Sequence, residues 1–230
     1  LGEVAGELAA RGLVGHAPVS VFHCAGALSS EVLAPARRAG PLVSVAQLHP
    51  MISFADLAFA PALARGQLHV EGDAPAVELG TQLGRRLGMS PRTVPGLAPV
   101  AYPAAAGLVA NGAAALAAGG VELLVRAGVP RSVAPLMLGP LLRSVAENVE
   151  ALGLPSALTG PVRRGEALSV ARHLATLASL APELVALYVA CARVQLPLAR
   201  ALGEADDEAL AAVARALDEA TPASAPAGTG

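Results

Sequence analysis

The spacing of apolar residues changes near Pro99, and this change constrains the fold more than any other feature of the sequence. Before it, short β-branched runs that end at glycine or proline alternate with segments of helical spacing, which is the pattern of an α/β layer. After it, every segment has helical spacing. The sequence therefore predicts an α/β domain over residues 1–98 and an all-helical domain over residues 99–219. The small, polar and proline-containing stretch 220–230 is expected to be a disordered tail.

Strands and helices can be placed approximately within this division. Four strands are expected in the segments "VSVFHCAG", "LVSVAQLHP", "QLHVEGD" and "RTV". Helices of the first half are expected near residues 3–11, 28–39 and 74–87, and helices of the second half near residues 105–127, 132–152, 166–179, 182–202 and 205–219. No internal repeat appears.

The core must be built from small and aliphatic side chains, because 54% of the residues are hydrophobic and only 2% are aromatic. The segment Thr93–Val121 carries no charged residue and is long enough to cross a membrane. Its prolines, its asparagine and its many glycines and alanines make it weakly hydrophobic and interrupt it repeatedly. The segment is therefore expected to be a tightly packed, buried helix rather than a membrane span.

Charge and cysteine content limit the classes of function. A net charge of -2 with very few aromatic residues gives no footprint for nucleic acid. The chain has no lysine, which excludes a Schiff-base mechanism. Its two cysteines show no zinc-type spacing, and no signal peptide is visible, so a reducing, cytoplasmic location is expected.

The first candidate site is "FHCAGALSSEVL". His23 stands near the carboxyl end of the first expected strand, and Gly26, Ser29 and Ser30 lead into a helix. Ligands of open α/β sheets bind at such strand ends, and the free amides of a helix amino terminus suit anions. The same residues are also typical of a helix cap with a histidine that hydrogen-bonds within the fold, and spacing alone favours this second interpretation.

The second candidate site is "LHPMISFAD", where His49 ends the second expected strand. Pro50 forces an extended turn, which places His49, Ser53 and Asp56 in one loop. With His23 at the neighbouring strand end, the two histidines could flank one cleft and supply acid–base chemistry near neutral pH. A metal is not expected, because no third ligand has diagnostic spacing.

Two further stretches lie in the second half. Asn111 sits within an apolar run, where it must find a partner on a neighbouring helix or on a ligand. In "ALTGPVRRGE", Thr159, Arg163 and Arg164 precede a helix, an arrangement that suits a carboxylate or phosphate and is also typical of a solvated turn.

Several motifs, taken in order, resemble a known family: "FHCAGALSSEVLAPARRAG", "LHPMISFAD", "VEGD", "AYPAAAGLVAN", "AENV" and "ALTGPVRRGEALSVARHL". The resemblance is to Rossmann-like proteins whose carboxyl-terminal domain of unknown function belongs to the 6-phosphogluconate dehydrogenase C-terminal-like superfamily. It covers about residues 1–200. It implies an oxidoreductase that uses NADP, is related to pyrroline-5-carboxylate reductase and the β-hydroxyacid dehydrogenases, and forms a homodimer through its helical domain.

The resemblance also implies a set of site residues. The segment His23–Ser30 would line the cleft for nicotinamide and a small-molecule substrate, Asn111 would project into it, and Thr159–Arg164 would close over it, from the same chain or from a partner subunit. By this likeness His23, His49 and Asn111 are the candidate catalytic residues. The candidate substrate-binding residues are Gly26, Ser29, Ser30, Ser53, Thr159, Arg163 and Arg164.

The sequence departs from the family pattern in two ways. No GxGxxG motif occurs in the chain, which begins about a third of the way into the pattern, so no residue can be assigned to the cofactor. In addition, the Tyr–His pair of the family reads Tyr102–Pro103 here. Two functions therefore remain: an NAD(P)-dependent oxidoreductase of a small carbonyl, imine or hydroxy-acid substrate, impaired by these departures, or a non-catalytic dimerising or ligand-binding module.

Overall fold

The computed structural model divides into two compact units, Leu1–Gly112 and Ala113–Gly230. It describes residues 1–56, 58, 63–94, 96, 98 and 100–220. The boundary expected at residues 98/99 and the division at 112/113 differ because the first turns of the long helical segment group with the sheet. The expected tail lies, from residue 221 onward, outside the described residues.

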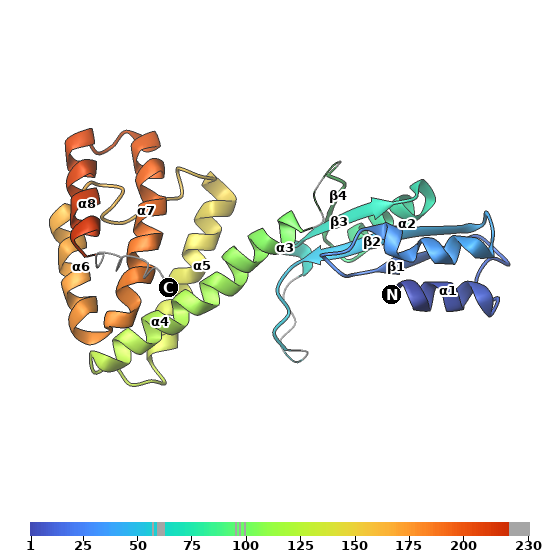
Figure 1. Cartoon of the computed structure of the whole chain (residues 1–230), viewed down its shortest axis with the longest axis horizontal. Coiled ribbons are helices and arrows are strands. Elements are labelled where there is room, and N and C mark those ends of the chain that lie inside the picture. The colour runs from blue at the N-terminus through green and yellow to red at the C-terminus, as the bar shows by residue number, and fades with distance from the viewer. Residues whose placement is uncertain (57, 59–62, 95, 97, 99, 221–230) are drawn as a thin grey trace, which may run out of the picture. The chain divides into compact units, whose positions relative to one another are not determined.

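The first unit contains a four-stranded mixed sheet in the order β1-β2-β3-β4 (Figure 1). Strand β1 is parallel to β2, β2 is antiparallel to β3, and β3 is parallel to β4. The predicted partial Rossmann-like layer followed by a helical domain is thus confirmed. The fourth strand ends earlier than the "RTV" segment predicted. The strands are β1 (Val19–His23), β2 (Val43–Met51), β3 (Gln67–Gly72) and β4 (Ser90–Arg92).

Helices cover both faces of this sheet. Helix α2 (Ala74–Arg86) packs so closely that a Cβ at Gly80 would stand 2.6 Å from the Leu48 side chain. The opposite face carries Val45, which is fully buried in a cluster with α1 (Gly2–Ala10) and η1 (Ser30–Ala39). Successive side chains of a strand point to opposite faces, so Leu48 and Val45 serve different layers. A short 3₁₀ turn, η2 (Leu63–Arg65), precedes β3.

The segment predicted as an ordinary helix near residues 28–39 is a 3₁₀ helix over Ser30–Ala39. Pro35 lies inside it and has no N–H to donate to an α-helical hydrogen bond. The backbone N–H of Val32 instead donates to the Ser29 carbonyl three residues back, and that of Gly40 donates to the Arg37 carbonyl.

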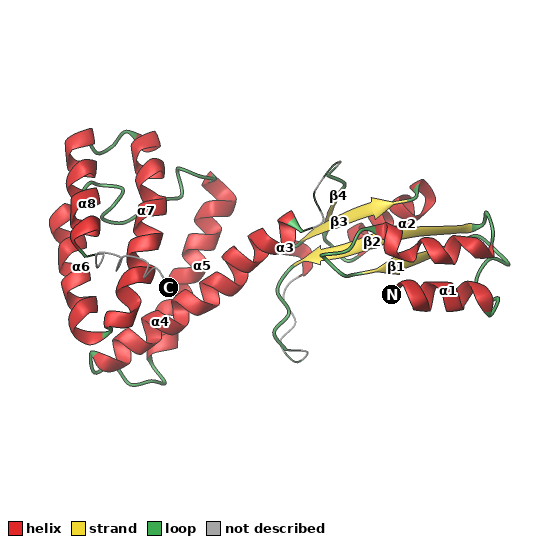
Figure 2. Cartoon of the chain, viewed as in Figure 1, coloured by secondary structure: helices red, strands yellow, loops and turns green. Residues whose placement is uncertain are grey.

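The second unit is helical, as Figure 2 shows. Its core cluster is built mainly from α6, α7 and α8, whose apolar stripes meet at Val170, Val189 and Leu217. Asp206 caps α8 by accepting a hydrogen bond from the Ala209 N–H at 2.7 Å. The helices are α4 (Gly112–Arg126), α5 (Ala134–Leu152), α6 (Ala167–Leu180), the 3₁₀ turn η4 (Pro182–Leu184), α7 (Val185–Leu202) and α8 (Asp207–Glu219).

Helix α4 is preceded without a break by α3 (Ala101–Ala106) and by a turn of π-helix, η3 (Gly107–Asn111). The prediction of a buried helix here is wrong: none of the helical residues 101–126 is buried in the chain. This helix and the segment Pro182–Leu202 are long and apolar enough to cross a membrane by length and composition alone, with mean hydropathy of 1.7 and 1.3. The cytoplasmic location expected from the sequence stays a prediction.

Candidate functional site

One face of the sheet changes from apolar to polar along its length. On this face Val45 is followed by Gln47 and His49, and the strand register sets Gln47 opposite Glu71 and His49 opposite His69. Directly opposed side chains of neighbouring strands lie close together on one face. Four polar side chains therefore gather beyond the region that α1 and η1 cover.

His23 shapes the turn that borders this polar group. It is buried, its Nδ1 accepts a hydrogen bond from the Ala25 N–H at 3.2 Å, and its Nε2 lies 3.1 Å from the Ser29 carbonyl oxygen. Since the carbonyl can only accept, Nε2 carries the proton. Both ring nitrogens are thereby engaged, and His23 holds residues 24–29 in place.

His49 packs against the same turn, and only one of its two ring nitrogens is hydrogen-bonded to it. Its Nδ1 lies 3.1 Å from the Cys24 carbonyl oxygen and must donate to it, so Nε2 of the neutral ring presents a lone pair. A Cβ at Gly26 would come within 2.6 Å of the His49 ring, so only glycine allows this close approach. The ring of Tyr102 meets His49 edge-on, with the centroids 5.2 Å apart.

His69 is the least satisfied polar side chain of the group. It is only 5% exposed, and within the part of the chain that the structure describes its Nδ1 has no hydrogen-bond partner. Burial lowers the pKa of His69, an effect that Glu71 opposes and His49 reinforces. His69 is therefore a neutral imidazole at pH 7.

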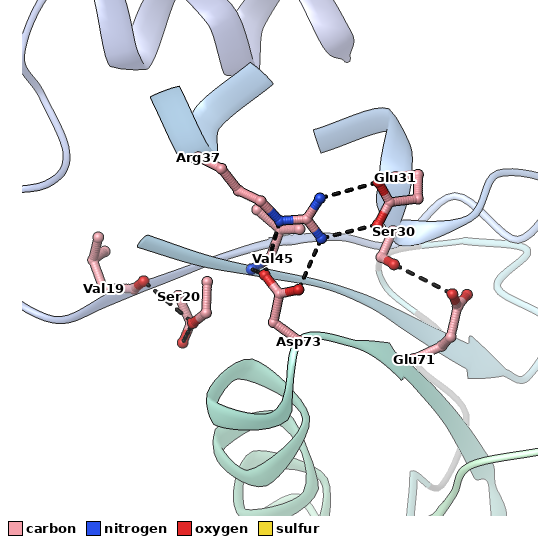
Figure 3. A network of polar contacts seen from close by, with 9 residues as sticks. Val19, Ser20, Ser30, Glu31, Arg37, Val45, Glu71 and Asp73 are labelled. Carbon is pink, nitrogen blue, oxygen red and sulfur yellow. Dashed lines mark hydrogen bonds and ion pairs between the residues drawn. The ribbon is translucent and has the colours of Figure 1, made fainter. Parts of the chain in front are cut away.

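Glu71 is held by a contact from the neighbouring 3₁₀ helix (Figure 3). The buried Ser30 hydroxyl donates to Glu71 Oε1 at 3.3 Å. Arg37 anchors η1 itself, because it donates to Asp73 Oδ1 at 2.8 Å and to the Glu31 carboxylate, while Asp73 Oδ2 accepts from the Val45 N–H. This network lowers the pKa of Asp73, chiefly through the hydrogen bond from Arg37.

These side chains enclose a small recess that adjoins a larger groove. The recess has a volume of about 20 Å³, enough for one water molecule. The groove has a volume of about 680 Å³, which suits a small molecule. Both are lined by Gly26, His49, Met51 and Tyr102. The recess is completed by Ser29, Gln47, His69 and Glu71, and the groove mainly by residues 50–53 and by the small side chains of α3 and η3.

The structure brings several of the predicted site residues together. Gly26, Ser29 and His49 line the recess, and Ser53 and Asn111 line the groove. Asn111 reaches it from the end of the π-helical turn, a distortion that is frequent at functional sites. His23 and Ser30 lie behind this surface as supports. Among the described residues, no three histidine, cysteine or acidic side chains are grouped to hold a metal ion.

Sequence reasoning missed Gln47, His69 and Glu71. A signal was present in "QLHVEGD", where Gln67, His69 and Glu71 alternate with Leu68 and Val70 and so share one face of a strand. The sequence did not reveal that this strand runs antiparallel to β2, and only that register sets His69 beside His49.

The remaining predicted residues lie in the helical unit. Arg163 donates through Nε to Glu204 at 2.8 Å and through Nη1 to the Leu158 carbonyl, and Arg164 pairs with Glu166 at 2.6 Å. Thr159 belongs to the same loop. Both arginines are thus engaged within their own unit, and their closing over a substrate stays a prediction.

Comparisons with known proteins agree with this fold. Residues 67–195, more than half of the chain, match the family model described as "Domain of unknown function (DUF2520)". A crystal structure of protein TM1727 from Thermotoga maritima is similar, with a TM-score of 0.63 and 24% identity over 78% of this chain and 68% of that one. So is the "putative NADP oxidoreductase BF3122" from Bacteroides fragilis, with a TM-score of 0.59 and 21% identity over 76% and 64%. No curated protein matches the chain.

Proposed function

The chain belongs to the DUF2520 family, and on that premise we propose that its α/β unit binds and orients the substrate of an NAD(P)-dependent oxidoreductase. The substrate is a small carbonyl, imine or hydroxy-acid compound. Support comes from the similarity in fold to a protein described as a "putative NADP oxidoreductase" and from the grouping of acid–base side chains beside a groove of small-molecule size.

The observation that carries this proposal is the pair of histidines in the recess. His49 offers the lone pair of Nε2, and His69 is a buried neutral imidazole next to Glu71. A group that is reduced or oxidised at a carbonyl or imine carbon must gain or lose a proton on its oxygen or nitrogen. A histidine near neutrality is the side chain best suited to exchange that proton. His49 is the proposed acid–base residue, and Tyr102 of α3 and Asn111 of η3 orient the substrate in the groove.

The cofactor is part of the proposal, but the residues of this chain do not fit its phosphate end. Dinucleotides are held by a glycine-rich loop between a strand and a helix, and no GxGxxG occurs among the 230 residues. The chain spans 68% and 64% of the lengths of the two solved structures that it resembles. We therefore assign no residue to NADP and derive no hydride step.

The helical unit supports a homodimer as the working form. Helix α5 exposes Leu136, Leu141 and Leu152, each at 60% or more, and only Ala134 of this helix is buried. By helical spacing Leu141 and Leu152 share one face with the exposed Val145 and Val149, and an exposed apolar face of this kind marks protein interfaces. We propose that two copies pair through α4 and α5. This exposed surface also favours the second candidate function, a dimerising module.

The deciding experiment is a calorimetric titration of the purified chain with NADPH, with its mass in solution measured alongside. Saturable binding, followed by oxidation of NADPH in the presence of small carbonyl or imine compounds, is the expected result. Absence of binding by a folded dimer would reject the oxidoreductase for this chain and leave the dimerising module.

A variant tests the acid–base residue separately. We expect His49→Gln to lower turnover by roughly 10²–10⁴-fold and to leave NADPH binding unchanged, because the ring exchanges a proton with the substrate. His16→Gln is the matched control, since His16 is exposed and its Nε2 bonds only locally, to the Gly12 carbonyl. Equal turnover by the two variants would remove His49 from the proposed chemistry.

A further inference from the structure

Three side chains around the recess, Glu71, Gln47 and His49, present hydrogen-bond acceptors. Glu71 contributes a carboxylate, of which Ser30 uses one oxygen. Gln47 donates its Nε2 to the Ala25 carbonyl at 2.7 Å, which turns its Oε1 the other way as an acceptor. His49 adds the lone pair of Nε2, because its Nδ1 donates to Cys24. A group that enters the recess therefore meets three kinds of acceptor.

The recess also carries a negative charge, which favours a cationic ligand. Glu71 is the single charged side chain among the described residues that line it, and no arginine is among them. The chain has no lysine that could reach it. A carboxylate in the recess would face the Glu71 carboxylate with no cation to offset the repulsion, whereas a protonated nitrogen would form charge-assisted hydrogen bonds.

The recess also limits the size of the group that enters. A volume of about 20 Å³ holds one polar atom with its hydrogens and little more. Along α3 and η3 the adjoining groove is walled by Ala105, Ala106, Val109 and Ala110, which offer no hydrogen-bonding side chain, and its polar lining is limited to His49, Ser53, Tyr102 and Asn111. A ligand that fits both spaces has one small polar head and a short apolar body.

We propose that the recess is a head-group subsite for the protonated nitrogen of a small aliphatic amine, whose apolar part lies along α3 and η3. The proposal rests on the function proposed above and names the substrate class of that same site. Glu71 and Gln47 recognise the cation, Ser30 positions Glu71, and the buried His69 gains a polar neighbour that the described residues do not supply.

Three probes with short alkyl chains of three or four carbons and different heads test this directly: n-butylammonium, n-butanol and n-butyrate. Binding is followed by NMR at pH 7.5 and constant ionic strength, through the ring signals of His49 and His69, which are two of only five histidines. We expect saturable shifts with a dissociation constant at least about tenfold lower for butylammonium than for butanol, and no saturation with butyrate.

The Glu71→Gln variant shows whether the Glu71 carboxylate causes the tighter binding of butylammonium than of butanol. It keeps an oxygen that can accept from Ser30, and we expect butylammonium and butanol to bind about equally. Glu78→Gln is the matched control, because Glu78 is an exposed carboxylate on α2 outside the recess, and the preference should persist.

Equal or tighter binding of butyrate by the wild-type chain would overturn the proposal, and so would the absence of any shift at His49 and His69. Persistence of the preference in Glu71→Gln would overturn the role of Glu71. None of these results depends on NADPH, so a failure of the amine subsite is distinct from a failure of the oxidoreductase proposal, which the NADPH titration reads separately.

Discussion

The two compact units leave different kinds of surface without partners. At the polar end of the sheet in the α/β unit, the groups with spare hydrogen-bonding capacity are His69, His49 and Glu71. In the helical unit, Arg163 and Arg164, which the sequence predicted to bind substrate, are paired with carboxylates. The exposed surface of α5 in this unit is apolar. The difference indicates that the α/β unit serves ligand chemistry and the helical unit serves assembly.

The same contrast appears inside the helical unit. Helices α5 and α8 both carry an apolar stripe, but Leu210, Val213 and Leu217 of α8 are at most 1% exposed, whereas Leu141 and Leu152 of α5 are each 60% exposed. An exposed stripe of this length is costly in water unless another surface covers it. The four predictions that follow run from the largest expected effect to the smallest: the first two test this contrast within the helical unit, and the last two test the polar contacts of the α/β unit.

The largest effect on the free energy of unfolding is expected in the buried core of the helical unit. Leu217→Ala removes a fully buried side chain from the core cluster and should lower the free energy of unfolding by about 2–5 kcal/mol. Urea unfolding followed by circular dichroism measures the loss. The matched control is Leu168→Ala on α6, where the side chain is 66% exposed and a change within about 0.5 kcal/mol is expected. Equal losses in the two variants would contradict the assigned core.

The second effect should change assembly without changing the fold. Leu141→Glu places a charge in the exposed stripe of α5 and should weaken self-association roughly a hundredfold, because the carboxylate would be buried at the proposed interface. Sedimentation equilibrium measures the dissociation constant, and the helical circular dichroism spectrum should not change. Leu168→Glu is the control. If both variants dimerise like the wild type, α5 is not the interface.

The contrast between α5 and α8 also shows what the sequence could and could not predict. Apolar spacing located both helices, and β-branched runs located β1, β2 and β3, because these patterns are local. The uncharged composition rich in glycine and alanine led to the wrong expectation of a buried helix after Thr93, since composition does not reveal which surface covers a helix.

The site was predictable to a similar extent. The sequence singled out His49, Gly26, Ser29, Ser53 and Asn111, which line the recess or the groove, because they stand at strand ends, in turns or in an apolar run, and their roles stay predictions. His69 and Glu71 come to the recess through antiparallel pairing, which depends on the register of residues far apart in the sequence.

The third prediction compares His23, whose ring nitrogens are both hydrogen-bonded, with His69, whose Nδ1 has no hydrogen-bond partner among the described residues. His23→Leu leaves the Ala25 N–H and the Ser29 carbonyl without partners and should destabilise the chain by about 1–3 kcal/mol. His69→Leu removes a buried nitrogen that has no partner among the described residues, so stability should stay the same or rise by up to about 1 kcal/mol. Urea unfolding measures both. A larger loss for His69→Leu would mean that its ring is already satisfied.

The smallest effect concerns the ion pairs that hold η1. Arg37 lowers the pKa of both Asp73 and Glu31, so their stabilisation is fully present above the ordinary carboxyl pKa, 3.8 for Asp73, and is lost as the pH falls through the lower folded-state pKa. At pH 6, Arg37→Met should cost up to about 1 kcal/mol of unfolding free energy, because the pairs are partly exposed.

The difference in unfolding free energy between the wild type and Arg37→Met should become smaller as the pH falls below about 4. The reason is that protonation of the carboxylates removes the interaction from the wild type as well. Urea unfolding at a series of pH values measures it. Arg86→Met, which removes an exposed charge at the end of α2, should keep a constant gap. A gap for Arg37→Met that is as large at pH 3 as at pH 6 would show that Arg37 stabilises η1 by packing rather than by charge.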